Sequence, residues 1–132
     1  MSEDQQRILV MDDEPMLAKF FKRALSRINC YVDTAPNGES ALELFQTSIH
    51  QELRYSLVIL DINVKEGLGG PETFKAIKEL DPEVRILACS GAWNDPIMTD
   101  YKEYGYIGAL AKPLQIQEML DSIGGFLAQS KV

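Results

Sequence analysis

Three carboxylates, one hydroxyl and one ammonium in this chain have the types and the spacing to perform phosphoryl chemistry. They belong to Asp12, Asp13, Asp61, Ser90 and Lys112. Each stands at or just beyond the end of an apolar run that is typical of a buried β-strand. If those ends meet, the five groups form a site for a divalent cation and a phosphoryl group, because carboxylates bind the cation and the other two groups bind phosphoryl oxygens.

The three carboxylates predict a cation site. Two unit charges about 4 Å apart repel by roughly 4 kcal/mol at an effective dielectric constant of 20, so such a cluster must keep a proton or bind a cation. Mg²⁺ suits it because this ion prefers oxygen ligands and retains several waters; Mn²⁺ could substitute. We expect Asp13 and Asp61 to bind the ion directly and Asp12 to bind through a water molecule. The backbone carbonyl of Asn63 could supply a further oxygen.

Lys112 distinguishes a phosphoryl site from a plain metal site. A metal among carboxylates has no need of an ammonium, whereas the anionic oxygens of a phosphoryl group do. Ser90 could donate a hydrogen bond to a second phosphoryl oxygen. With its oxygens held, the phosphoryl group could pass in line to Asp61. Asp61 is therefore the predicted nucleophile, and an acyl phosphate is the predicted product.

Four apolar runs would carry these groups to one edge of a sheet. They span Ile8–Met11, Leu57–Leu60, Val84–Cys89 and Ile107–Ala111. A more polar run, Tyr31–Ala35, predicts an edge strand. The carboxyl ends of parallel strands share one edge of the sheet, and ligands bind there.

Helical patterns alternate with the strand-like runs. They begin at or beside Pro15, Asn37, Pro71, Pro96 (with Asn94 or Asp95 as its cap) and Ile116. Successive βαβ units predict an α/β fold, a doubly wound (βα)5 three-layer sandwich with a parallel five-stranded sheet in the order 2-1-3-4-5. That order places the topological switch point between strands one and three, where the three aspartates would meet.

Size, charge and cysteine content bound the classes of function. We expect the 132 residues to form one domain, 1–132, with a core at about 7–127. The formal net charge of −7 opposes nucleic-acid or anionic-membrane binding.

No apolar stretch approaches the roughly 20 residues of a membrane span, and the polar N-terminus is unlike a signal peptide. Cys30 and Cys89 lie in apolar segments, so we expect reduced thiols and a cytoplasmic protein. No obvious apolar stripe remains after the core positions are assigned, which favours a monomer and leaves dimerisation open.

Together these motifs closely resemble the receiver domain of two-component response regulators, over Arg7 to about Leu127. That family has an acidic pair after the first strand, an aspartate after the third, Ser or Thr after the fourth and Lys-Pro after the fifth. Here these are Asp12-Asp13, Asp61, Ser90 and Lys112-Pro113, and Gly69, eight residues past Asp61, also matches.

The resemblance implies a flavodoxin-like fold and a phosphoacceptor switch. It implies Mg²⁺-dependent phosphorylation of Asp61 by the phosphohistidine of a histidine kinase or histidine phosphotransfer domain, followed by a change of conformation that relays the signal. The domain would catalyse only its own phosphorylation and dephosphorylation, and it would not be an enzyme in the ordinary sense.

Two residues depart from the family pattern. Lys65 replaces the proline usually found four residues after the phosphoacceptor, which predicts a more flexible or differently shaped loop. Ala109 replaces the aromatic residue usually found three residues before the lysine. The aromatic half of the switch is therefore absent or relocated, to Tyr104 or Tyr106.

Two segments carry further expectations. Residues 90–96 and 104–106 look most like those of receivers appended to hybrid sensor histidine kinases. The fourth helix is expected to present Met98, Tyr101 and Tyr104, partly exposed, as a candidate partner surface. Trp93 should lie at the rim of the site and report on it by fluorescence.

The sequence opposes two other functions and leaves a third open. Haloacid-dehalogenase-like phosphatases carry a second aspartate two residues after the nucleophile, where this chain has Asn63. A flavodoxin-like flavin carrier would need a Ser/Thr/Gly-rich phosphate loop after the first strand, where this chain has acidic residues that would repel the flavin phosphate. The remaining alternative is a pseudo-receiver that acts by protein binding without phosphorylation.

Overall fold

The computed structural model describes residues 5–129, so residues 1–4 and 130–132 of the expected domain lie outside the described residues. Strands and helices alternate along the chain. In order they are β1 (Gln6–Met11), α1 (Pro15–Ser26), β2 (Cys30–Ala35), α2 (Gly38–His50), β3 (Leu57–Asp61), α3 (Gly70–Leu80), β4 (Ile86–Ser90), α4 (Pro96–Thr99), β5 (Gly108–Ala111) and α5 (Ile116–Gln129).

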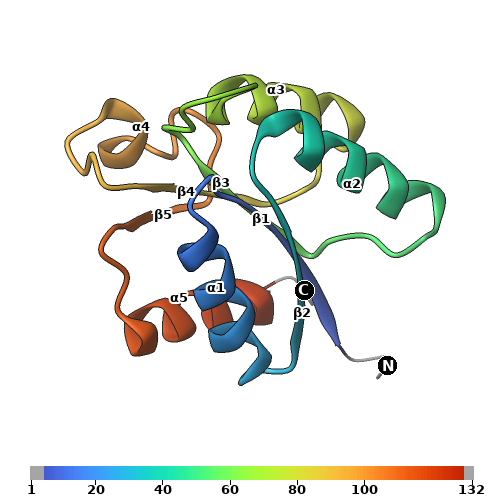
Figure 1. Ribbon diagram of the computed structural model, residues 1–132, viewed down its shortest axis with the longest axis horizontal. Coiled ribbons are helices and arrows are strands. Elements are labelled where there is room, and N and C mark those ends of the chain that lie inside the picture. The colour runs from blue at the N-terminus through green and yellow to red at the C-terminus, as the bar shows by residue number, and fades with distance from the viewer. Residues whose placement is uncertain (1–4, 130–132) are drawn as a thin grey trace.

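The sheet has five parallel strands in the order β2-β1-β3-β4-β5, as the sequence predicts. Figure 1 shows α1 and α5 on one face of this sheet and α2, α3 and α4 on the other, which is a doubly wound three-layer sandwich. The internal strands β3 and β4 are buried along their whole length because helices cover both faces of the sheet there. β2, the more polar strand, pairs with β1 and lies at an edge of the sheet.

Two hydrophobic clusters fill the space between the sheet and the helices. One lies under α1 and α5 and includes Phe21, Leu25 and Ile123; the other lies under α2, α3 and α4 and includes Phe45, Ile77 and Met98. Cys30 and Cys89 are free and buried in the first cluster, as expected for reduced thiols. Among residues 5–129, no helix is both long and apolar enough to cross a bilayer.

Helix starts follow the local signals that the sequence carries. Pro15 occupies the first turn of α1, and Pro71 the first turn of α3. The Asn37 side chain accepts a hydrogen bond from the Ser40 backbone N–H at 2.9 Å and caps α2, as predicted.

The fourth helix is much shorter than the sequence predicts. It begins at Pro96 with Asp95 as its cap, as expected, but it ends at Thr99. The residues that follow form turns. In the last of these turns Gly105 has a φ of +91°, and the Tyr106 backbone N–H donates a hydrogen bond to the Tyr101 carbonyl. Thr and Asp have low helix propensity, and Thr99-Asp100 stands where the helix stops.

The expected exposed face of that helix is partly wrong for the same reason. Met98 is only 7% exposed because it enters the cluster under α2, α3 and α4. Tyr101 packs against that cluster and is partly exposed, as expected. Tyr104 is exposed. Tyr106 is buried and lies 4.4 Å, centroid to centroid, from the ring of Phe74 on α3. Burial of Met98 and Tyr106 in the core therefore replaces the exposed face of a regular helix.

Candidate functional site

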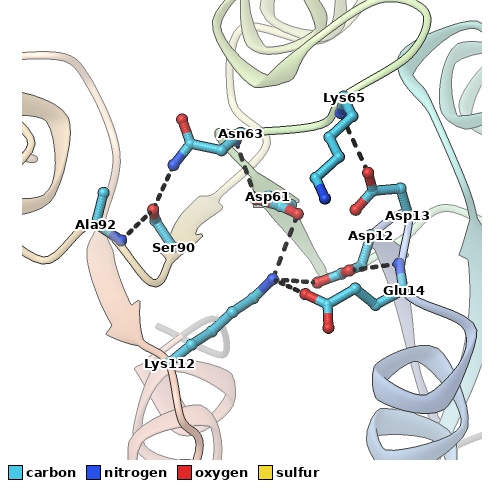
Figure 2. Close-up of polar contacts among 9 residues, drawn as sticks. All are labelled: Asp12, Asp13, Glu14, Asp61, Asn63, Lys65, Ser90, Ala92 and Lys112. Atoms are coloured by element: carbon cyan, nitrogen blue, oxygen red, sulfur yellow. Dashed lines mark hydrogen bonds and ion pairs between the residues drawn. The ribbon is translucent and has the colours of Figure 1, made fainter.

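Four strand ends bring the predicted site residues to one edge of the sheet. Asp12 and Asp13 follow β1, Asp61 ends β3, Ser90 ends β4 and Lys112 follows β5. The ladder continues beyond the strands, since the Lys112 backbone N–H bonds to the Ser90 carbonyl at 2.9 Å and fixes where that lysine leaves the sheet. All five residues lie together, as Figure 2 shows.

The three carboxylates form one cluster. Each of Asp12, Asp13 and Asp61 offers an oxygen, and these oxygens all lie within 4.8 Å of one another. Asp12 and Asp61 are buried, whereas Asp13 is half-buried and faces the open side of the site. Such a group of hard oxygen donors, open to solvent on one side, matches the preference of Mg²⁺.

Asp12 carries the clearest sign of an unsatisfied group. Its Oδ1 accepts from the Glu14 backbone N–H at 2.9 Å. Its buried Oδ2 lies 3.1 Å from the Lys112 ammonium but makes no hydrogen bond of ordinary geometry. Burial raises the pKa of the Asp12 carboxyl, even though the Glu14 N–H and Lys112 act in the opposite direction. A cation at this cluster would relieve the cost of that buried charge.

Lys112 is held by three carboxylates. Its ammonium lies 3.1 Å from Asp12 Oδ2, 3.1 Å from Glu14 Oε1 and 3.4 Å from Asp61 Oδ2. Partial burial alone would lower the pKa of Lys112, but these carboxylates outweigh it and raise the pKa above its ordinary value. The ammonium is therefore charged at neutral pH and lies beside the predicted phosphoacceptor.

Ser90 is held by two donors. Its Oγ accepts from the Asn63 side-chain amide at 2.6 Å and from the Ala92 backbone N–H at 2.9 Å. Because the hydroxyl oxygen accepts in both contacts, its own proton remains free to be donated. Ser90 is completely buried, and these two donors fix the position of its hydroxyl oxygen.

Asn63 contributes more to the site than the sequence predicts. Its backbone N–H donates to Asp61 Oδ1 at 3.0 Å, in addition to the side-chain bond to Ser90. One residue thus connects the predicted nucleophile to the predicted hydroxyl donor. The predicted use of its carbonyl as a metal ligand remains a prediction.

Two charged residues at the site were not predicted to act there. Glu14 pairs with Lys112, and Lys65 donates its backbone N–H to Asp13 Oδ2 at 3.1 Å. Glu14 directly follows Asp13 and Lys65 lies four residues after Asp61. This closeness in sequence is the only feature from which their place at the site could have been predicted. From the sequence, Glu14 could equally be a helix cap, and Lys65 could equally be a solvated loop residue.

The loop after Asp61 is tied down by the start of α2. Gly38 donates to the Leu68 carbonyl at 2.9 Å, and Glu39 accepts from the Leu68 backbone N–H at 2.7 Å. At its far end, a Cβ on Gly70 would lie 2.6 Å from the Ile62 Cα and 2.8 Å from the Asp61 carbonyl, so only glycine fits this close approach.

The site opens into a pocket of about 750 Å³. Its lining includes Asp13, Asp61, Asn63, Lys65, Ala92 and Lys112. Trp93, next to Ala92 in sequence, is 70% exposed, and its place at the rim of the site stays a prediction. A three-layer α/β sandwich with an acidic triad and a lysine at its switch point defines the class of receiver domains.

Sequence comparison places the chain in that class directly. Residues 8–124 match the profile of the response regulator receiver domain, so the chain belongs to this family. It is a signalling receiver domain with the acidic triad and Lys112 of a phosphoacceptor site, and not a classical enzyme.

Individual relatives agree with this assignment. The chain is 30% identical over 118 residues to the chemotaxis protein CheY of Bacillus subtilis, which covers 89% of this chain and 93% of that protein. It is 25% identical to the sporulation initiation phosphotransferase F of the same bacterium, covering 92% and 94%. The chain spans from 15% to 94% of the length of the curated relatives that it matches.

A solved structure is similar in both fold and sequence. The response regulator TrrA of Thermotoga maritima, determined in complex with Mg²⁺ and a beryllium fluoride, has a TM-score of 0.76 and 28% identity to this chain. The alignment covers 92% of this chain and 98% of that one.

Proposed function

We propose that this domain takes a phosphoryl group onto Asp61 from the phosphohistidine of a histidine kinase or phosphotransfer protein, and relays it as a change of conformation. The observation that best supports this is the meeting of Asp61, the two other aspartates and the Lys112 ammonium in one open site. Each group has a separate task in phosphoryl transfer, and a structural ion pair would not need three carboxylates.

The acidic triad would hold Mg²⁺. We assign Asp13 and Asp61 as direct ligands, Asp12 as a ligand through water and the Asn63 carbonyl as a further oxygen. The buried Asp12 Oδ2 without a hydrogen bond supports this assignment, as does the Mg²⁺ bound to TrrA. When bound, Mg²⁺ would supply positive charge to the phosphoryl oxygens; Mn²⁺ could substitute.

The transfer itself needs little from the protein beyond position and charge. A carboxylate oxygen of Asp61 attacks phosphorus, the bond from phosphorus to the imidazole nitrogen breaks, and that nitrogen keeps the electron pair. A carboxylate nucleophile has no proton to lose, so no general base is required. Lys112 neutralises one phosphoryl oxygen, and the Ser90 hydroxyl, whose oxygen already accepts from Asn63, donates a hydrogen bond to another.

The change of conformation would begin at Ser90 and Lys112. The acyl phosphate adds about −1.5 to −2 charge, as other phosphorylated side chains do, and draws both groups toward Asp61. Ser90 accepts from the Ala92 N–H, so its movement pulls the loop before α4. Moving such a switch from 1:99 to 99:1 takes about 5.5 kcal/mol of differential stabilisation.

We propose Tyr106 as the relocated aromatic residue of the switch. It is 3% exposed and its buried hydroxyl has no hydrogen-bond partner, whereas Tyr104 is 47% exposed. Burial raises the pKa of the Tyr106 phenol, and the nearby Asp95 adds to that effect. Because Ala109 has no ring to move, NMR of the free and beryllofluoride-bound protein should show small changes around Ala109.

The setting of the domain is also a proposal. We propose that residues 7–127 form a single receiver domain that works in the cytoplasm as a monomer. The free, buried cysteines support a reducing compartment. Its segments 90–96 and 104–106 favour a placement in a hybrid sensor histidine kinase.

Phosphorylation by a small acyl phosphate tests this function. Intact mass should show one phosphoryl group on the wild type, only when Mg²⁺ is present. Asp61→Asn should take none, and Lys112→Met should react about a hundredfold more slowly. Absence of any phosphoryl gain by the wild type, with no Mg²⁺-dependent change in Trp93 fluorescence, would contradict the proposal and favour a pseudo-receiver.

A further inference from the structure

Lys65 reaches back over the phosphoacceptor site from the loop that follows β3. Its backbone N–H is anchored on Asp13 Oδ2 at 3.1 Å, and its side chain lines the same pocket as Asp61 and Lys112. Figure 2 shows its ammonium pointing toward the space between the Asp61 and Asp13 carboxylates.

The two lysines of the pocket differ in whether their ammonium groups form ion pairs with carboxylates. Lys112 lies within 3.4 Å of three carboxylates. The Lys65 ammonium makes no ion pair with any carboxylate among residues 5–129, and its side chain is exposed. It therefore carries a positive charge directed at the site and available to an anion that arrives there.

The lysines also approach from different elements. Lys65 comes from the β3–α3 segment and Lys112 from the end of β5, and in Figure 2 they enter the site from opposite sides. The solvent side, where Lys65 lies, is the side from which water can reach an acyl phosphate on Asp61, because the other side is closed by the buried strands.

We propose that Lys65 is a second phosphoryl-binding residue of this site. Its ammonium binds an oxygen of the phosphoryl group on Asp61 from the solvent side and restricts the approach of hydrolytic water. This inference rests on Asp61 being the phosphoacceptor. The same charge opposes the binding of Mg²⁺ in the unphosphorylated domain, because two cations then share one carboxylate cluster.

The two effects of Lys65 have opposite signs, and this makes the proposal testable. Removal of the charge should strengthen Mg²⁺ binding and weaken the binding of a phosphoryl analogue at saturating Mg²⁺. A lysine that only repelled the metal, without binding the phosphoryl group, would not weaken the binding of the analogue when its charge is removed.

The test compares Lys65→Met and Lys65→Arg with the wild type, with Lys75→Met on the exposed face of α3 as the matched control. Trp93 fluorescence or calorimetry gives the Kd for Mg²⁺ and, at saturating Mg²⁺, for beryllofluoride. Lys65→Met should bind Mg²⁺ at least threefold more tightly and beryllofluoride at least fivefold more weakly. Its phosphoaspartate should hydrolyse at least threefold faster. Lys65→Arg and Lys75→Met should stay within twofold of the wild type.

Two results would overturn the inference while the proposed function stands. One is a Lys65→Met protein that matches the wild type in all three measurements. The other is tighter binding of both Mg²⁺ and beryllofluoride, which would mean that Lys65 repels the metal without touching the phosphoryl group. A wild type that neither binds Mg²⁺ nor gains a phosphoryl group would instead overturn the proposed function, and this inference with it.

Discussion

Two polar clusters lie on the sheet, and they differ in how their charges balance. At the carboxyl end, Asp12, Asp61 and Glu14 share the single ammonium of Lys112. Beside β1 and the edge strand β2, Asp33 Oδ2 accepts from the Tyr55 hydroxyl at 2.6 Å and from Arg7 Nη2 at 3.3 Å.

The second cluster is close to complete by itself. One carboxylate meets one guanidinium, and the Arg7 guanidinium carbon lies 4.8 Å from the Tyr31 ring centroid and 5.3 Å from that of Tyr55. Only Arg7 Nε there is buried without a hydrogen bond. A cluster built for stability balances its charges, whereas the Asp12–Asp61–Lys112 cluster keeps an excess of negative charge, which a cation can offset.

The largest effect on stability should come from the balanced cluster. Asp33→Ala leaves the Arg7 guanidinium and the Tyr55 hydroxyl, both largely buried, without their acceptor. We expect the free energy of unfolding to fall by about 2 kcal/mol, as measured by urea denaturation, while the affinity for Mg²⁺ stays unchanged. Arg54→Ala, which breaks the exposed pair with Asp81, is the control and should cost less than about 1 kcal/mol. Equal losses of unfolding free energy in Asp33→Ala and Arg54→Ala would show that the Asp33 cluster stabilises the fold no more than an exposed ion pair does.

The acidic site should respond to substitution with the opposite sign. Asp12→Asn removes a buried charge while its amide oxygen can still accept from the Glu14 N–H. We expect the metal-free protein to gain roughly 1 kcal/mol in the free energy of unfolding and to lose the stabilisation that Mg²⁺ gives the wild type. A destabilised variant would show that the pair with Lys112 outweighs the cost of burial.

The pH dependence of that gain follows from the raised pKa of Asp12. Between its ordinary value of 3.8 and the raised pKa, the folded state binds more protons than the unfolded state. The contribution of Asp12 to stability therefore falls as pH rises through this window. The difference between Asp12→Asn and the wild type should be absent below the window, grow within it and be constant above it.

The smallest effect should come from a buried polar group that belongs to neither cluster. Tyr106→Phe removes a hydroxyl that is buried and has no hydrogen-bond partner. We expect a gain of about 0.5–1 kcal/mol in the free energy of unfolding, because no hydrogen bond is lost. If Tyr106 is the relocated aromatic of the switch, the same variant should alter the NMR changes that beryllofluoride induces near α4. A loss of stability would indicate that the hydroxyl has a partner in solution.

The sequence alone determined the sheet order and the meeting of Asp12, Asp13, Asp61, Ser90 and Lys112. It could do so because parallel strands with right-handed crossovers allow few topologies, and all of these residues stand at strand ends. Helix starts were also local, since Pro15, Asn37 and Pro96 act through their own backbone geometry or side chain.

Only the tertiary structure decided how those residues are connected. The length of α4 depends on whether Met98 and Tyr106 can enter the core, which involves strands and helices far away in sequence. The bond from Asn63 to Ser90, the pair between Glu14 and Lys112, and the direction of Lys65 depend on side chains from different loops meeting in space. Local propensity acts over a few residues, whereas the balance of charge in a buried site is set by every chain segment that reaches it.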